Sequence, residues 1–217
     1  MIRGSNCFGL RWFLPLMLVV EGCSVLTPQA DPSRFFMLTP SAEALADEPT
    51  GMKASEVSLG IGPVTLPEYL KRPEMVIRTS ADEVKLSDTD RWAEPLESNF
   101  QSVLGQNLAN LLGTQKIVFF PWYGLPQIDY QVQVQVYRFD ISPVGQACLR
   151  ARWIVKDPKD GAILAAKEDS MTSQAVAADR SGSAALSQTL AMLDREIAES
   201  IVQLNRSGPS ALTYPRE

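Results

Sequence analysis

The chain has 217 residues, of which 45% are hydrophobic and 8% aromatic, so it can bury one good-sized core and is too apolar for a disordered chain. Its net charge of −5, without a long lysine or arginine cluster, argues against a nucleic-acid binder, which needs a basic footprint to neutralise phosphates. The chain contains no histidine, which excludes a Ser-His-Asp hydrolase.

The first 22 residues have the features of a secretory signal. Arg3 and Arg11 form a positively charged start without an acidic residue, and an apolar run interrupted by Pro15 follows over Trp12–Val20. That run is far shorter than the roughly 20 residues needed to span a bilayer. We therefore expect a cleaved signal rather than a transmembrane anchor.

The end of this signal resembles a lipobox. Gly22 and Cys23 fit the motif in which a cysteine receives diacylglycerol and becomes the mature N-terminus, whereas Glu21 replaces the usual small residue. Ser24 after the cysteine resembles outer-membrane sorting. The alternative is an ordinary secreted protein in which Cys23 is incidental.

The predicted organisation has four parts. Residues 1–22 form the lipoprotein signal peptide, 23–34 the acylated N-terminus and tether, 35–208 a single domain and 209–217 a disordered tail.

Cys148 is the only thiol left free once Cys7 is removed with the signal and Cys23 is acylated. A single thiol in an oxidising compartment is best kept buried, so we expect Cys148 inside the domain. A catalytic thiolate would need a histidine partner, and the chain has none.

Two short strands are predicted near the start of the domain. Phe35–Leu38 is the first, and a mobile loop over Ser41–Ser55 follows it. Val57–Ile61 then alternates apolar and polar residues, as a half-buried strand does, and Gly62-Pro63 ends it.

The stretch Leu66–Leu96 forms one block. Pro67 and Pro73 bracket the loop Tyr69–Arg72, because each ring fixes its own φ. Two strand-like runs follow, joined by a polar turn, and predict a hairpin over residues 74–79 and 83–86. Trp92 closes the block before the next helix.

The clearest helix covers residues 95–112. Glu94 stands at the expected cap with Pro95 at the first helical position, and Gly113 supplies the left-handed stop. One apolar stripe recurs at spacings of three and four, formed by Leu96, Phe100, Val103, Leu104, Leu108, Leu111 and Leu112. The helix is expected to pack on a sheet.

An aromatic loop and an antiparallel meander are predicted next. Residues 117–120 form a short strand, and Trp122–Pro126 a loop that caps a core edge or contacts a partner. Strict alternation over residues 128–136 predicts a strand with one buried face, and Phe139 falls out of phase, which indicates a bulge. Return strands follow over residues 149–155 and 162–171.

A second long helix is predicted from Ser183, as its cap, to Ser207. Its stripe consists of Leu186, Leu190, Leu193, Ile197, Ile201 and Leu204. Two helices and about seven strands, mostly in meander order, predict an α+β two-layer fold: a mainly antiparallel sheet with both helices on one face.

Four stretches carry a family resemblance: LPEYLKRPEMVIR at residue 66, RWAEPL at 91, VQVQVYRFD at 132 and LRARW at 149. Together they span most of the mature chain, and they resemble the PqiC-type family of ABC-transport auxiliary lipoproteins. The stretches contain no catalytic group, so the resemblance implies a role rather than a reaction.

The resemblance implies a periplasm-facing lipoprotein of the outer membrane that serves a transporter built on an MCE (lipid-carrying) protein. Its implied partners are that MCE-domain protein, an inner-membrane permease, the outer membrane through the lipid anchor, and other copies of the chain in a ring. The implied activity is the movement of phospholipid between the two membranes.

Two segments are candidate contacts with a partner or another subunit. One is the loop with Tyr69, Leu70 and Arg72; the other is the polar sheet face formed by Gln131, Gln133, Gln135, Arg150 and Arg152. Arginines can make forked hydrogen bonds with carboxylates or phosphates. The alternative is that this face simply meets water.

No cofactor, metal or catalytic residue is predicted. The chain has neither a histidine or cysteine cluster nor a phosphate-binding G-x-x-x-x-G-K, and its acidic pairs lack the spacing of a calcium loop. Three functions stay open: the auxiliary lipoprotein of lipid transport, a protein-binding envelope scaffold, and a small-ligand-binding periplasmic module with a pocket under the aromatic loop.

Overall fold

The structure is a computed structural model that describes residues 31–41, 54–122, 127–173 and 182–207. The chain divides into two units, residues 1–32 and 33–217, and the fold described below is that of the second. Cys23, the signal peptide and the predicted tail from residue 209 lie outside the described residues, as do most of the predicted loop at 41–55 and residues 174–181.

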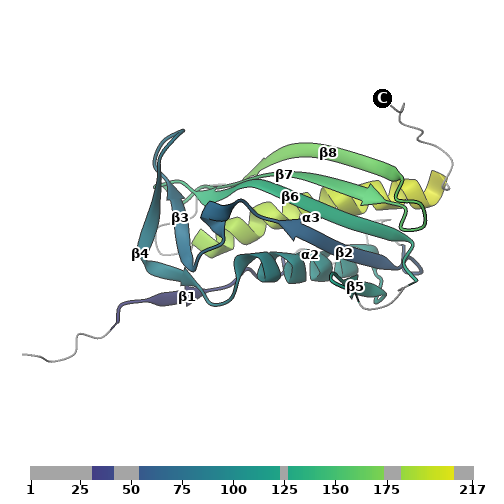
Figure 1. Cartoon of the computed structure of the whole chain (residues 1–217), viewed down its shortest axis with the longest axis horizontal. Helices are drawn as coiled ribbons and strands as arrows, with labels where there is room; N and C mark the ends of the chain where they lie inside the picture. Colours follow the sequence, from purple (N-terminus) through teal and green to yellow (C-terminus); the bar gives the residue numbers. More distant parts are fainter. Residues whose placement is uncertain (1–30, 42–53, 123–126, 174–181, 208–217) are drawn as a thin grey trace, which may run out of the picture. The chain divides into compact units, whose positions relative to one another are not determined.

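The second unit has two layers, an eight-stranded sheet and two α-helices along one of its faces (Figure 1). The α+β prediction is thereby confirmed, with eight strands in place of about seven. In chain order the elements are β1 (Arg34–Phe36), β2 (Leu59–Thr65), the 3-10 turn η1 (Glu68–Leu70), β3 (Glu74–Arg78), β4 (Val84–Trp92), α2 (Leu96–Leu112), β5 (Ile117–Phe119), β6 (Tyr130–Ile141), β7 (Ala147–Lys156), β8 (Ile163–Thr172) and α3 (Gly182–Ser207).

The sheet is organised around β6. On one side β6 pairs with β7 along its whole length, and β7 pairs with β8, which is the predicted antiparallel meander. On the other side β6 is shared: its first half pairs with β2 and its last residue, Ile141, with Ile77 of β3. Both of these contacts are parallel, as are those of β1 with β4 and β2 with β5, so the sheet is mixed.

The predicted bulge at Phe139 is confirmed. The register of β6 against β7 shifts between Val136 and Arg138. The extra residue turns Phe139 back toward the helices, where its ring meets Phe100 of α2 at 5.5 Å between centroids. The same shift places Arg138 and Asp140 on the opposite face.

The prediction that Gly62-Pro63 ends a strand is wrong, because β2 continues to Thr65 across an irregularity between Ile61 and Val64. Two side-chain amides donate hydrogen bonds to backbone carbonyls at this break. Gln101 donates to the carbonyl of Ile61 at 3.0 Å, and Gln131 donates to the carbonyl of Gly62 at 2.8 Å. The irregularity therefore leaves these two carbonyls satisfied, and the strand resumes.

The helix ends differ slightly from prediction. Pro95 is the residue before α2, so the predicted cap at Glu94 is one position early, whereas Gly113 has the expected left-handed φ of 68°. Ser183 lies within the first turn of α3 rather than before it.

Residues 38–41 lie across both helices. Asn99 of α2 accepts a hydrogen bond from the backbone N–H of Leu38 at 2.6 Å, Ser187 of α3 accepts one from Thr39 at 3.1 Å, and Asn107 of α2 accepts one from Ser41 at 3.1 Å. We call residues 38–41 the strap. Side chains of both helices thus fix the chain that follows β1.

Asn107 also joins the two helices directly. Its side-chain amide donates to Asp194 of α3 at 2.5 Å, and Asp194 is fully buried. The other carboxyl oxygen of Asp194 has no hydrogen-bond partner among the described residues. Burial raises the pKa of Asp194 well above its ordinary value, and the bond from Asn107 offsets this only in part.

Candidate functional site

The sheet face opposite the helices carries the predicted polar residues. Gln135 lies opposite Arg152 in the register of β6 and β7, and Arg152 lies opposite Glu168 of β8. Alternation places Gln131, Gln133 and Arg150 on this same face. The structure therefore brings all five predicted residues of β6 and β7 together on what we call the open face.

The glutamines of the open face differ in availability. Gln131 is half-buried and held by Gly62, Gln133 is half-buried, and Gln135 is exposed, with the Tyr137 hydroxyl 3.3 Å from its amide oxygen. Of the three side chains, Gln135 is therefore the one that a partner can reach directly.

The two predicted arginines also differ. Arg150 forms an ion pair with Glu168, with both Nε and Nη2 close to one carboxylate oxygen, and its guanidinium lies over the ring of Tyr137. Arg152 is exposed and forms no hydrogen bond or ion pair with the described residues. A partner carboxylate or phosphate can therefore bind Arg152 without breaking an existing contact, whereas at Arg150 it must compete with Glu168.

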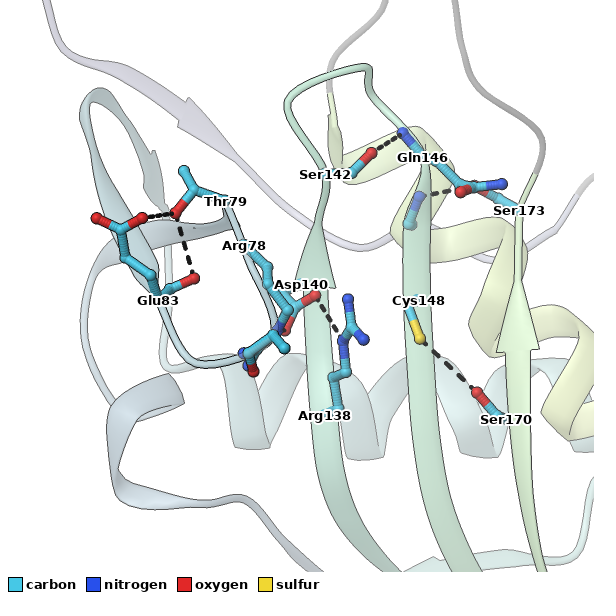
Figure 2. A network of polar contacts seen from close by, with 12 residues as sticks. Arg78, Thr79, Glu83, Arg138, Asp140, Ser142, Gln146, Cys148, Ser170 and Ser173 are labelled. Atoms are coloured by element: carbon cyan, nitrogen blue, oxygen red, sulfur yellow. Dashed lines mark hydrogen bonds and ion pairs between the residues drawn. The ribbon is translucent and has the colours of Figure 1, made fainter.

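A buried ion cluster lies where β3 meets β6 (Figure 2). Asp140, which is fully buried, accepts hydrogen bonds from Nε of Arg78 at 2.8 Å and from Nε of Arg138 at 2.9 Å. Burial alone lowers the pKa of Arg78, but its bond to Asp140 and the negative charge there outweigh this and raise the pKa overall.

Tyr69 covers this cluster. Its hydroxyl is buried beside Arg78 and Asp140. Burial and the nearby charge of Asp140 raise the pKa of Tyr69, so the hydroxyl keeps its proton. Tyr69, predicted as a surface contact, thus packs over an internal ion cluster.

The other residues of the predicted contact loop differ in exposure: Leu70 is buried, whereas Lys71 and Arg72 are exposed. Leu70 is 2% exposed and belongs to the core, so its side chain does not reach a partner. Lys71 pairs with Glu68 at 2.6 Å, and Arg72 is exposed without a hydrogen bond or ion pair to the described residues. Arg72 is therefore the residue of this loop that is free to bind.

Arg72 lines a cavity of about 560 Å³. The cavity lies between two stretches of the family resemblance, the loop after η1 and the chain that leads into α2. Its lining consists of Lys71, Arg72, Pro73, Trp92, Ala93, Glu94, Pro95, Leu96, Glu97 and Ser98. The lining is mixed in charge and partly apolar, which suits a small polar ligand or a peptide.

The aromatic loop is only partly described. Trp122 packs edge-on against Phe120, at 5.4 Å between ring centroids, and touches the position where Gly60 lacks a side chain. Tyr123–Pro126 lie outside the described residues, so the predicted pocket under this loop is untested there. The cavity at Arg72 is a different place.

Cys148 differs from expectation. It lies half-buried on the open face, with its sulfur 3.7 Å from the hydroxyl of Ser170, rather than in the core (Figure 2). It faces outward because its register partner is Asp140, which also lies on the side away from the helices.

Chemistry-bearing clusters are few in this part of the chain. Over the described ranges, no three His, Cys, Asp or Glu side chains come together as metal ligands would. Among the helices in those ranges, none is both long and apolar enough to cross a bilayer.

Sequence reasoning missed the ion cluster. Arg138 and Asp140 stand two residues apart at the end of a strand, a spacing that places them on one face and could have been noticed. The third member, Arg78, is 62 residues away, and only the pairing of β3 with β6 brings it there.

Comparison with known proteins gives a family and a fold. The model of one family, described as the ABC-type transport auxiliary lipoprotein component, matches residues 36–198. A crystal structure of a Xanthomonas campestris protein assigned to the DUF330 family superposes with a TM-score of 0.63 at 15% identity, covering 80% of this chain and 99% of the other.

A second crystal structure, of an uncharacterised protein, superposes with a TM-score of 0.54 at 16% identity and covers 79% of this chain and 97% of its own. At these identities the two structures support the fold alone. No curated protein sequence matches the chain.

Proposed function

The chain belongs to the family of ABC-type transport auxiliary lipoprotein components, and from this membership we propose its particular role. It is a non-enzymatic lipoprotein, anchored in the outer membrane by Cys23 and facing the periplasm. It serves an MCE-type transport system that moves phospholipid between the inner and outer membranes and supports envelope integrity.

The family match over residues 36–198 is the observation that carries this proposal. The lipobox-like Gly22-Cys23 supports the anchor, and Ser24 supports outer-membrane sorting. The partners we propose are the MCE-domain protein and the permease of the same system. A homo-oligomeric ring of this chain is part of the proposal because the family resemblance implies it.

The open face supports a docking role. One face of the sheet packs on two helices, whereas the other presents Gln135 and an unpaired Arg152 to solvent. Long strands with polar side chains form a broad surface on which another protein can lie, and a free guanidinium binds a carboxylate without first losing a bond. We propose that the MCE partner or a neighbouring subunit covers this face.

Intact mass of the mature protein from a membrane fraction tests the anchor. Acylated Cys23 as the first residue is the expected result, and Cys23→Ala is expected to lose the lipid mass. A soluble protein that begins elsewhere would overturn the lipoprotein assignment.

Pull-down of the MCE partner with Arg152→Ala tests the docking face. We expect weaker capture, with a smaller loss for Arg150→Ala because Glu168 already occupies that side chain. The matched control is Lys85→Ala, which removes one exposed positive charge from the β3–β4 hairpin. Equal capture by Arg152→Ala and the control, at equal stability, rules out this face.

The cavity at Arg72 favours a second candidate, a small-ligand-binding module. Its volume of about 560 Å³ lies within the range of ligand pockets, roughly 300–1,000 Å³. Native mass spectrometry of the purified protein tests it: a bound small molecule that Arg72→Ala releases would favour this role. A protein-binding scaffold without a lipid role predicts capture of partners and no co-purifying lipid.

A further inference from the structure

Two large apolar side chains are exposed together at the first strand of the domain. Phe35 in β1 is 64% exposed and Met37, just after it, is 47% exposed. Their neighbours turn the other way: Phe36 packs against the core and Leu38 is buried. The alternation means that Phe35 and Met37 lie on one side of the chain, away from the core.

We propose that Phe35 and Met37 rest on the lipid surface in which the N-terminus is anchored. The inference rests on the proposed acylation of Cys23, and it goes further by assigning a membrane-contacting edge to the folded domain itself. The contact is apolar and superficial, with the two side chains at the level of the lipid headgroups.

The length of chain between anchor and strand supports this contact. Phe35 is the twelfth residue after Cys23, and at full extension this length of chain spans at most about 43 Å. That is roughly the length of β6, the longest strand, with 12 residues at about 3.3 Å each. The tether therefore keeps β1 within about one β6 length of the membrane surface.

The position of β1 in the sheet leaves its outer side open. Among the described strands β1 pairs only with β4, over three residue pairs, and it lies at the end of the sheet order (Figure 1). A strand of three residues offers few backbone groups for pairing with a second copy. A lipid surface needs no such register and accepts two isolated apolar side chains.

Charge does not oppose the contact. The exposed Arg34 forms an ion pair with Asp90 of β4, 2.7 Å between Nη2 and Oδ1, and its guanidinium lies over the ring of Phe36. This pair is neutral overall, so it neither holds β1 to anionic lipid nor repels it. Burial of the apolar side chains of Phe35 and Met37 in lipid then favours the orientation in which β1 rests on the membrane over one in which the domain hangs free on its tether.

Photo-crosslinking of the acylated full chain tests the proposal. Phe35→benzoylphenylalanine keeps an aromatic side chain, and the protein is placed in vesicles of phosphatidylethanolamine and phosphatidylglycerol after intact mass has verified acylation. The matched control is Val144→benzoylphenylalanine, at a 71% exposed turn position between β6 and β7. Lipid adducts at position 35 well above those at 144 are expected.

Every other outcome decides against the contact. Equal adducts at 35 and 144 in an acylated protein overturn it and leave the proposed function intact. Adducts from 35 to a second protein chain show that the edge is a subunit contact. Absence of acylation overturns both the anchor and the contact that rests on it.

Hydrogen exchange gives an independent measurement. In vesicles, compared with detergent micelles, amides of residues 34–38 are expected to exchange more slowly. Full burial of one phenylalanine and one methionine would favour the resting orientation by more than about a hundredfold, and Phe35→Ser with Met37→Ser should remove that preference. Val144→Ser with Met192→Ser, two exposed apolar positions elsewhere, should leave it unchanged; an equal effect from both pairs would overturn the proposal.

Discussion

Two fully buried aspartates in this domain have opposite surroundings. Asp140, at the end of β6, accepts hydrogen bonds from two guanidiniums, those of Arg78 and Arg138. Among the described residues, Asp194, between the helices, accepts a hydrogen bond from the side-chain amide of Asn107 and forms no ion pair, and one of its oxygens has no hydrogen-bond partner. Both lie at 0% exposure.

The difference shows two ways to bury a carboxyl group. Where strands from distant parts of the chain meet, opposite charges surround it and its removal leaves those charges uncompensated. Where two helices pack, burial disfavours the charged form and raises the pKa of Asp194, so this group holds its proton to a higher pH than an exposed aspartate does. The two sites should therefore respond differently to mutation, and the raised pKa makes stability at Asp194 depend on pH.

The largest effect is expected for Asp140→Ala. It leaves two guanidiniums facing each other, with 17% of the Arg78 side chain exposed, and should lower the free energy of unfolding by about 3–5 kcal/mol. Urea denaturation measures this. The control is Asp90→Ala, which breaks the exposed pair with Arg34 and should cost less than about 1 kcal/mol. Similar losses of unfolding free energy for the two variants would show that the buried Asp140 cluster contributes no more than the exposed pair.

A smaller loss is expected for Asn107→Ala, about 1–3 kcal/mol. It removes the acceptor for the N–H of the half-buried Ser41 and the hydrogen bond to Asp194, whose carboxyl group stays fully buried without that bond. Gln106→Ala is the neighbouring control, because Gln106 is exposed and its side chain bonds, among the described residues, only to Ser102 on its own helix. Thermal unfolding that ranks the two variants equally would show that the strap and helix contacts contribute little.

The third effect, at Asp194, is a pH dependence of the stability. A carboxyl group whose folded pKa is raised contributes stability that is full below its unfolded pKa, near 4, and is lost as pH rises through the folded pKa. Over that window the loss approaches about 1.4 kcal/mol per pH unit. Asp194→Asn keeps the shape without the proton, so the difference in stability between variant and wild type should grow with pH. A constant difference would show that Asp194 does not titrate there.

Periodicity explains what could be predicted from the sequence. The apolar stripe from Leu96 to Leu112 and the alternation from Ile128 to Val136 depend only on local spacing, and both elements formed with the expected face buried. The break in that alternation at Phe139 predicted the bulge for the same reason.

The remaining features depend on which segments become neighbours. Alternation gives the face of a residue but not the strand beside it, so the parallel contacts of β2 and β3 with β6 were missed, and with them the Arg78–Asp140 pair. The five candidate residues of the open face were placed on one face correctly. Which of their side chains are available to a partner was not predictable, because it depends on the ion pair between Glu168 and Arg150. Among the described residues, Arg152 has no such pair.

The strap has a mechanical consequence. The chain passes from the proposed anchor into β1 and then across both helices, where Asn99, Asn107 and Ser187 hold residues 38–41. A force on the tether is therefore borne in series, first by the short β1–β4 pairing and then by three side-chain bonds rooted in two helices. If the membrane and a bound partner move apart, the β1–β4 pairing and the strap bear the tension before it reaches the sheet meander.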